Sequence, residues 1–441
     1  AQHMSSLENF QKRQREKFRS LFCVTAPRNK MPEKIKNILI AGAGPVGLIA
    51  ALKLSQAGIP VTVFEKESKL LDDPRAATTH PATLEMLDDI GMAKQAEKQG
   101  LICDEFYFWD RPTNEIIAKF SHRLLKDETK FPYVVQCEQF KLAKIALSML
   151  RKYADSRVLF SHEVVGVSQD SGQVRLRVKG PNGEENITGT YLLGCDGGKS
   201  IIRKSSNVQF EGFTYPERFV VYTTPFNFET ARGCCFRNYY ADPDEWSNLF
   251  KVAGDGPPGI WRAVFPTDMS LTDAEVMDDN AIQIRMQKFF PKKGNYEIIH
   301  RNVYTINQRV ASKFRIGRIL LAGDSAHLNN SIGGMGLNGG IHDAINAADK
   351  IIKISRGEAD DGALDIYDLQ RRTTTCEFTQ AQTIANKKRL EARDPNTRKA
   401  NLTELKKTAA NQELAKKFMM GTSMLSAVRR AARLGKDTRG E

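Results

Sequence analysis

The chain has 441 residues, of which 41% are hydrophobic, so it is long enough to bury a sizeable core in two or more domains. Its formal net charge of +13 comes from its ends, because residues 1–36 carry +6, residues 387–441 carry +9 and the remaining body carries −2. We interpret the ends as solvated basic segments and, with no nucleic-acid-binding motif beside them, expect no nucleic-acid partner. No apolar run approaches the roughly 18 residues of a membrane-spanning helix, so no transmembrane segment is expected.

The seven cysteines include no C-x-x-C pair. An odd number without metal-ligand spacing favours free thiols in a reducing compartment over a disulfide framework or a zinc site. The N-terminal region also lacks the continuous apolar stretch of a secretory signal peptide. We therefore expect a cytoplasmic protein without a bound metal.

The first predicted elements form a βαβ unit. Residues 36–42 are an apolar run that ends in glycine, which is typical of a buried parallel strand. Residues 45–57 have helical spacing, and residues 59–65 form a second β-branched run. Strand, glycine turn, helix and strand within ~30 residues indicate a nucleotide-binding α/β domain.

The rest of the chain mixes helical and strand patterns. Helices are expected at 81–99, 141–153 and 340–356 and from 362 onward, and strands at 105–109, 133–136 and 316–323. Four short runs between 157 and 194, separated by Asp-Ser-Gly and Pro-Asn-Gly turns, predict an antiparallel meander. Residues 208–305 are rich in aromatic residues without a βαβ rhythm, which predicts a sheet that roofs a pocket.

These patterns divide the chain into five parts. We expect a basic N-terminal extension, the first part of a nucleotide-binding domain, a substrate-side sheet domain, the second part of the nucleotide-binding domain and a basic helical region, at residues 1–35, 36–207, 208–305, 306–360 and 361–441. The nucleotide-binding domain is therefore predicted to be discontinuous.

A glycine-rich turn joins the first strand to the first helix. Gly42, Gly44 and Gly47 match G-x-G-x-x-G: the first permits a tight turn, the second lets a pyrophosphate approach the backbone, and the third lets helix and strand pack closely. The helix N-terminus offers free N–H groups to phosphates. Glu65 ends the next strand, where an acidic side chain can accept hydrogen bonds from an adenosine ribose. Dinucleotide binding is predicted, with FAD and NAD both open.

Further motifs suit the same cofactor. Arg75 is either a donor to a pyrophosphate or nicotinamide cofactor or a solvated surface charge. Asp196-Gly197 ends one apolar strand and Gly323-Asp324 ends another; Asp324 can hold a hydroxyl of a flavin's ribityl chain, and each pair can also be an ordinary turn or cap. The glycine-rich segment 333–340 exposes backbone N–H groups at a helix start, which suits a polarised or anionic ligand edge.

In this order the motifs resemble those of the single-component, FAD-dependent aromatic hydroxylases, the family of para-hydroxybenzoate hydroxylase. Residues 307–344 are similar to the 3-(3-hydroxyphenyl)propionate hydroxylase branch. The resemblance implies an α/β fold in which a Rossmann-like, glutathione-reductase-type FAD-binding domain carries an inserted antiparallel-sheet substrate domain and C-terminal helices. The residues that it assigns to the cofactor are Gly42, Gly44, Pro45, Val46, Gly47, Glu65, Lys66, Arg75, Gln136, Asp196, Gly197, Asp324, Gly336, Leu337 and Asn338.

The resemblance also implies an activity. NAD(P)H reduces the FAD, O2 adds to it as a C4a-hydroperoxide, and one oxygen atom enters a phenolic or heteroaromatic substrate. The expected partners are a small aromatic substrate and O2, with a homodimer as a further possibility. Two catalytic candidates follow: Tyr222, which can help to deprotonate a substrate phenol, and His327, which is either a proton relay or a structural histidine. Ser331 stands where many relatives have proline beside the flavin.

Other functions stay open at this point. A FAD-dependent reductase or dehydrogenase without oxygen transfer shares every cofactor motif, whereas a non-catalytic binding protein of the same fold has no need of Glu65, Asp196 and Asp324 together. The inserted segment supplies candidates for contact with the substrate, each of which can also be a core residue. They are Tyr222, Phe226, Tyr239, Tyr240, Trp246, Trp261 and Arg262.

Overall fold

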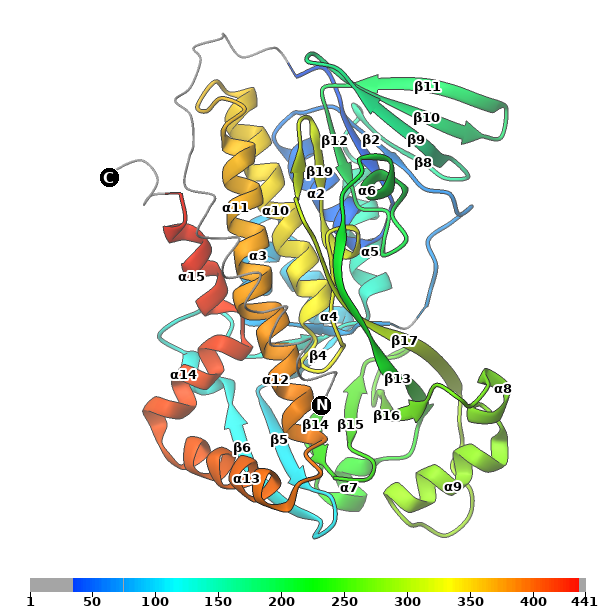
Figure 1. The fold of residues 1–441 in the computed structure, drawn as a ribbon, viewed down its shortest axis with the longest axis vertical. Coiled ribbons are helices and arrows are strands. Elements are labelled where there is room, and N and C mark those ends of the chain that lie inside the picture. Colours follow the sequence, from blue (N-terminus) through cyan, green and yellow to red (C-terminus); the bar gives the residue numbers. More distant parts are fainter. Residues whose placement is uncertain (1–34, 74, 436–441) are drawn as a thin grey trace.

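The computed structural model describes residues 35–73 and 75–435, so the predicted basic extension lies almost wholly outside the described residues. The chain forms two large sheets, with long helices running beside both of them (Figure 1). Within the described part, no helix combines the length and the apolar character that a bilayer crossing requires.

The first large sheet has six strands in the order β18-β19-β12-β1-β2-β8. All neighbours pair in parallel except β18 and β19, which form a hairpin. Parallel strands covered on both faces are apolar throughout, and every residue of β1 is buried. The strands are β18 (Arg315–Ile316), β19 (Ile319–Leu321), β12 (Tyr191–Gly194), β1 (Ile38–Ala41), β2 (Val61–Phe64) and β8 (Ser156–Leu159).

The antiparallel meander is smaller than the sequence predicts. It contains β9 (Glu163–Gln169), β10 (Val174–Gly180) and β11 (Gly183–Gly189) in the order β11-β10-β9. The first of the four predicted runs is β8, and the last, 187–194, divides into the end of β11 and the separate strand β12; β8 and β12 join the six-stranded sheet instead. The local turn signals identify hairpins, but they do not show that a run pairs with a strand about one hundred residues away.

The second large sheet has eight strands in the order β20-β17-β13-β16-β15-β14-β5-β6. It is antiparallel except between β14 and β5. Its strands are β20 (His327–Leu328), β17 (His300–Ala311), β13 (Phe210–Thr224), β16 (Ile260–Asp268), β15 (Ser247–Val252), β14 (Arg237–Ala241), β5 (Glu105–Asp110) and β6 (Glu115–Ser121).

This sheet also corrects the predicted division of the chain. Residues 105–121 were assigned to the first part of the FAD-binding domain, but β5 and β6 extend the eight-stranded sheet through the parallel pair β5–β14. At the other end, β17 and β20 carry the same sheet past residue 306. Sequence patterns show strands but not their partners, so they miss segments that one domain receives from another.

Helices cover the six-stranded sheet and connect it to the second one. Helix α2 (Pro45–Gln56) packs between α5 (Gln139–Leu150) and α10 (Met335–Ser355). Helix α11 (Ala363–Thr374), the π-helical segment η3 (Thr375–Gln380) and α12 (Ala381–Leu390) follow one another without a break along both sheets (Figure 1). Helices α13 (Pro395–Ala410), α14 (Gln412–Thr422) and α15 (Leu425–Arg433) complete the C-terminal region, and the first two lie against β6.

The remaining elements are short. A small sheet has the order β3-β7-β4, and the other elements are helices or 3-10 turns. They are β3 (Thr78–Thr79), β7 (Val134–Gln136), β4 (Leu101–Cys103), α3 (Pro81–Asp89), α4 (Ala93–Gln99), α6 (Ile201–Ser205), α7 (Phe228–Arg232), α8 (Asp273–Val276), α9 (Asp279–Phe289), η1 (His122–Leu125) and η2 (Gly323–Ser325).

The parallel sheet predicts one stability effect. Leu320 belongs to β19, which lies between β12 and β18, and none of its surface is exposed. Leu320→Ala should therefore leave a cavity and lower the free energy of unfolding by about 2–5 kcal/mol. Urea denaturation followed by circular dichroism measures the change. Ile102→Ala, at a side chain that is 52% exposed, should change it by less than about 0.5 kcal/mol. Equal effects of the two substitutions would contradict this role of Leu320.

Candidate active site

The glycine turn between β1 and α2 has the geometry that its sequence predicts. Gly42 has a φ of +102°, and a Cβ there would overlap the carbonyl oxygen of Cys195. A Cβ at Gly47 would overlap the carbonyl oxygen of Gly42, whereas Gly44 faces open space. Helix α2 begins directly after Gly44, with no side-chain cap and no acidic residue in its first turn. Its first N–H groups are therefore free for an anionic ligand.

Glu65 lies beside this turn and holds its shape. Its Oε2 accepts a hydrogen bond from the backbone N–H of Ala43 at 2.8 Å, and its Oε1 accepts one from the N–H of Glu67 at 3.0 Å. A carboxylate oxygen accepts more than one hydrogen bond, so Glu65 keeps capacity for a ribose hydroxyl. Lys66, also predicted for the cofactor, is exposed and its Nζ lies 3.7 Å from Oε1 of Glu67. The structure thus brings Glu65 to the turn but gives Lys66 no contact with it.

The Gly-Asp turn after β19 packs against the same turn. A Cβ at Gly323 would lie 3.1 Å from the side chain of Val46, and a Cβ at Gly340 would lie 2.7 Å from it. These close approaches place Asp324 next to the start of α2. The Asp324 side chain is accessible, yet protein surrounds its carboxyl on most sides, and the resulting desolvation raises its pKa against the charges of His327 and Arg75. An accessible carboxyl in such surroundings can accept a hydrogen bond from a hydroxyl group of a ligand.

Asp196 has a different role from Asp324. Its Oδ1 accepts from the hydroxyl of Ser200 at 2.6 Å, and its Oδ2 accepts from the N–H of Ile202 at 3.1 Å. Asp196 therefore caps α6, and burial raises the pKa of its carboxyl. Its backbone still borders the glycine turn, because a Cβ at Gly42 would lie 3.2 Å from Cα of Asp196. Gly197 follows with a φ of +78°, which turns the chain away from β12.

Gln136 carries an amide nitrogen that no described residue satisfies. Its Oε1 accepts from the hydroxyl of Thr78 at 2.6 Å, but its buried Nε2 has no hydrogen-bond partner there. A buried donor without a partner costs free energy and indicates a missing acceptor. The ring edge of a flavin, which carries carbonyl oxygens and nitrogens, is an acceptor of this kind. The resemblance assigned the same residue to the flavin, and this orphaned donor supports that assignment.

The start of α10 is held in place by Asn338. Its Nδ2 donates to the carbonyls of Thr78 and Gly334 at 2.8 and 2.6 Å, and its Oδ1 accepts from the N–H of His80 at 2.9 Å. The side chain of Asn338 therefore positions the backbone of Gly336 and Leu337 and is not itself available to a ligand. Gly334 caps the helix with a φ of +69°, so the first N–H groups of α10 lack a side-chain cap.

Arg75 lies close enough to Asp324 for its charge to act on that carboxyl, but its own side chain is exposed. Its Nε donates to Asp73 at 2.8 Å, and its side chain is 63% exposed. Its carbonyl accepts from the buried guanidinium of Arg262 at 2.9 Å. Arg262, a predicted substrate contact, thus anchors the segment of Arg75. Taken together, the uncapped helix starts, Glu65, Asp324 and the orphaned amide of Gln136 fit a dinucleotide such as FAD.

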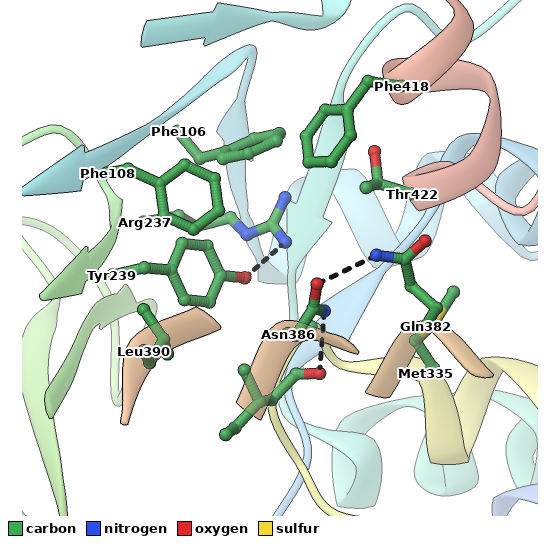
Figure 2. A pocket seen from close by; sticks show the side chains of 12 residues that line it. Phe106, Phe108, Arg237, Tyr239, Met335, Gln382, Asn386, Leu390, Phe418 and Thr422 are labelled. Atoms are coloured by element: carbon green, nitrogen blue, oxygen red, sulfur yellow. Dashed lines mark hydrogen bonds between the residues drawn. The ribbon is translucent and has the colours of Figure 1, made fainter. Parts of the chain in front are cut away.

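An aromatic pocket lies beside the start of α10, with an empty volume of about 380 Å³, part of which opens to solvent. Figure 2 shows aromatic rings on one side and the amides of Gln382 and Asn386 on the other. The Nε2 of Gln382 donates to Oδ1 of Asn386 at 2.8 Å. The pocket is lined by Phe106, Phe108, Arg237, Tyr239, Ile332, Gly333, Met335, Gln382, Asn386, Leu390, Phe418 and Thr422.

The predicted catalytic role of Tyr222 is wrong in this structure. Side chains alternate along β13, so Phe219 and Val221 face the apolar cluster on the pocket side, while Val220 and Tyr222 face the opposite cluster. The hydroxyl of Tyr222 is buried there and donates to the carbonyl of Val276 at 2.8 Å. It cannot reach a phenol in the pocket, because the sheet lies between them.

The contacts of His327 support the structural one of its two predicted roles. Its ring is buried against Phe314, and its Nε2 lies 3.0 Å from Oδ2 of Asp343. Asp343 also accepts from Nε of Arg371 at 2.7 Å and from the N–H of Gly323 at 3.0 Å. This buried cluster ties the Gly-Asp turn to α10 and α11. His327 therefore positions Asp324 through the turn and does not contact the pocket.

The substrate-side candidates divide between the two faces of the sheet. Tyr239 lines the pocket, and Trp246 belongs to the apolar cluster behind it. Phe226, Tyr240 and Trp261 pack with Tyr222 on the far face. Arg237, Phe418 and Asn386 could not be predicted from the sequence, because no motif surrounds them and the segments that carry them meet only in the folded chain. Phe106 and Phe108 alternate in a predicted strand, which was the one available signal for them.

The comparisons with known proteins agree with this geometry. A family model described as "FAD binding domain" matches residues 36–382. The chain belongs to this family. It is 31% identical over 400 residues to para-nitrophenol 4-monooxygenase of Pseudomonas sp. (strain WBC-3), an alignment that covers 90% of this chain and 98% of that protein.

Two further relatives support the assignment. The chain is 33% identical over 341 residues to a 3-(3-hydroxy-phenyl)propionate/3-hydroxycinnamic acid hydroxylase of Shigella sonnei (strain Ss046), covering 76% of this chain and 59% of that longer protein. The crystal structure of p-nitrophenol 4-monooxygenase from Pseudomonas putida DLL-E4 superposes with a TM-score of 0.83 at 29% identity, over 90% of this chain and 98% of that one.

These findings confirm the predicted family, the fold class and the FAD cofactor. The protein is a FAD-dependent aromatic monooxygenase that uses NAD(P)H and O2. The reductase and the non-catalytic alternatives are thereby set aside. Among the described residues, Cys103, Cys137, Cys195, Cys234 and Cys235 are free thiols, and no group of three or more His, Cys, Asp and Glu side chains could hold a metal ion.

The glycine turn predicts loss of the cofactor on a small substitution. Gly42→Ala should reduce the FAD content of the purified protein at least tenfold, because the new Cβ overlaps the Cys195 carbonyl and displaces the turn. Gly58→Ala is the matched control, since Gly58 also has a positive φ (+76°) but no atom within 4 Å of the new Cβ. Flavin absorbance per polypeptide measures the result. Equal FAD content in both variants would contradict the proposed geometry.

The buried cluster around Asp343 predicts a pH effect. Burial raises the pKa of Asp343, but the charge of Arg371, with the His327 and Gly323 hydrogen bonds, holds it below the ordinary value. A lowered folded-state pKa stabilises the fold above the unfolded pKa of about 3.9, and this contribution is lost as the pH falls through the folded value.

Asp343→Asn should therefore lower the free energy of unfolding at pH 7 by about 3–5 kcal/mol, because it leaves Arg371 without its carboxylate. It should also flatten the loss of stability below about pH 4. Asp349→Asn, on the same helix as Asp343, removes only a more exposed pair with Lys53 of α2 and should cost about 0–1 kcal/mol. Urea titrations across pH measure both, and an unchanged acid slope in Asp343→Asn would overturn the assignment.

Proposed function

We propose that this monooxygenase hydroxylates a single-ring phenol held in the aromatic pocket. The observation that carries the proposal is a shared wall. Gly333 and Met335 line the pocket, and they immediately precede the backbone of Gly336 to Asn338, which is expected to face the flavin edge. A ring in this pocket therefore lies next to the expected position of the reactive part of the cofactor.

The lining of the pocket supports an aromatic substrate. Most of the side chains around it are aromatic or aliphatic. Such a lining limits the access of water to a reactive oxygen species. The relatives named for para-nitrophenol support extending a one-ring phenolic substrate to this chain.

The reaction consumes NAD(P)H and O2, the two substrates that react with the flavin. When bound, FAD accepts hydride from NAD(P)H and activates O2; one oxygen atom then enters the ring and the other leaves as water. The chain itself holds the cofactor through the glycine turn, Glu65 and Asp324, and orients its ring edge through Gln136.

Ser331 contributes a hydroxyl to the wall next to the pocket. Its Oγ lies 3.0 Å from the hydroxyl of Tyr304, and burial raises the pKa of Tyr304. The tyrosine therefore stays protonated at neutral pH, and the pair forms a fixed polar contact at the position where many relatives have a rigid proline. We infer that this contact replaces the stiffness of the proline ring.

We also infer a cytoplasmic location and a homodimer. The free thiols of Cys103, Cys137, Cys195, Cys234 and Cys235 support a reducing compartment. The homodimer stays a prediction, and light scattering of the purified protein tests it by comparing the measured mass with that of one chain.

Isotope labelling tests the proposed function. The purified yellow protein, supplied with NAD(P)H, ¹⁸O₂ and a panel of single-ring phenols, should yield a hydroxylated product that carries one ¹⁸O atom, detected by mass spectrometry. NAD(P)H oxidation in the absence of phenol is the control for uncoupled turnover. If NAD(P)H is consumed across the whole panel without labelled product, the proposed substrate class is wrong.

A further inference from the structure

Arg237 brings a positive charge into the wall of the aromatic pocket. It begins β14 and is only 3% exposed. Its guanidinium lies 5.2 Å from the ring centre of Phe106 and 6.0 Å from that of Tyr239, and its Nη2 donates to the Tyr239 hydroxyl at 3.0 Å. Figure 2 shows this group pointing into the space enclosed by the labelled side chains.

This guanidinium is only partly satisfied. Its Nε and Nη1 are buried and have no hydrogen-bond partner in the described part of the chain. None of the ion pairs among those residues includes Arg237. Its charge acts on neighbouring histidines instead: together with burial, it lowers the pKa of His80 to about 3 and holds that of His122 well below its usual range. Both histidines are therefore neutral and cannot offset or share the charge.

Other buried arginines of this fold are compensated. Arg371 pairs with Asp343 at 2.7 Å, and Arg111 pairs with Glu245 at 3.3 Å. Arg203 has no carboxylate partner but donates to two backbone carbonyls at 2.8 Å. A buried, unpaired charge costs several kcal/mol, so the absence of an acceptor at Arg237, beside a pocket, indicates that a ligand supplies one.

We propose that Arg237 binds a substituent of the substrate that carries negative charge on oxygen, such as a carboxylate or a nitro group. This inference rests on the proposed function, since it places the phenol ring in the same pocket. Phe106, Phe108 and Tyr239 pack against the ring, and the unpaired nitrogens of Arg237 donate to the substituent. Neutral phenols of the same size then bind more weakly, because they leave Arg237 unpaired.

Binding to the FAD-loaded protein tests this directly. We expect 4-hydroxybenzoate or 4-nitrophenol to bind wild type at least tenfold more tightly than 4-methylphenol, measured by the change in flavin fluorescence. Arg237→Met should weaken binding of the preferred phenol at least thirtyfold and change that of 4-methylphenol less than threefold. Arg237→Lys, which keeps the charge, should retain part of the preference.

A stability measurement separates ligand binding from a structural role. Arg237→Met removes an unpaired buried charge, so the thermal midpoint without substrate should stay unchanged or rise; a marked fall would show that Arg237 serves the fold and would overturn the proposal. Arg232→Met is the matched control, because Arg232 also contacts aromatic rings but donates to the carbonyl of Phe289 on the far face of the sheet. It should leave the phenol preference unchanged.

The outcomes distinguish the two proposals. If wild type hydroxylates phenols but prefers 4-methylphenol, or if Arg237→Met weakens all three phenols equally, the assignment of Arg237 fails while the proposed function stands. If wild type binds FAD but hydroxylates no phenol, the proposed function itself fails. If Arg237→Met does not fold, the order of the three affinities in wild type still decides whether Arg237 selects a negatively charged substituent.

Discussion

The site depends on backbone contacts that leave no room for a Cβ atom. Gly42 lies against Cys195 at the end of β12, Gly47 lies against Gly42, and Gly323 and Gly340 lie against Val46. These contacts gather the carboxyl ends of β1, β12 and β19, which come from three separate parts of the chain. In parallel sheets, ligands bind at this end of the strands. The expected FAD site thus depends on how closely the backbones of these three segments approach one another.

The second constraint is the alternation of side chains along the eight-stranded sheet. One face of that sheet covers the pocket, and the other packs against α9 with its own apolar cluster. Neighbouring aromatic residues therefore have opposite roles: Tyr239 lines the pocket and Tyr240 lies in the far core. A shift of one residue in register would exchange them, which is why residue type alone does not identify a substrate contact here.

The two halves of the site differ in whether their buried charged groups have partners. On the cofactor side, Asp343 is surrounded by Arg371, His327 and the Gly323 N–H, and this closed cluster fixes the Gly-Asp turn. On the substrate side, Arg237 keeps two buried nitrogens without an acceptor. A satisfied network stabilises a fixed shape, whereas an unsatisfied donor stores free energy that binding releases. Buried charge is thus fully paired beside the expected cofactor site and unpaired in the wall of the aromatic pocket.

The sequence alone determined the elements whose signal is local. The glycine turn, Glu65, the Asp-Gly turn and the Gly-Asp turn each stand in a short pattern of strand, turn and helix, and the ordered set of the three turns was enough to indicate the family. Gln136 followed only from that resemblance. Tertiary structure decided everything that depends on strand partners and sheet faces: the entry of β8 and β12 into the parallel sheet, the transfer of β5 and β6 to the substrate side, the removal of Tyr222 from the pocket and the presence of Arg237 in it. The physical reason is that pairing across the sheet joins residues far apart in the chain, and a pattern read along the chain carries no record of such pairs.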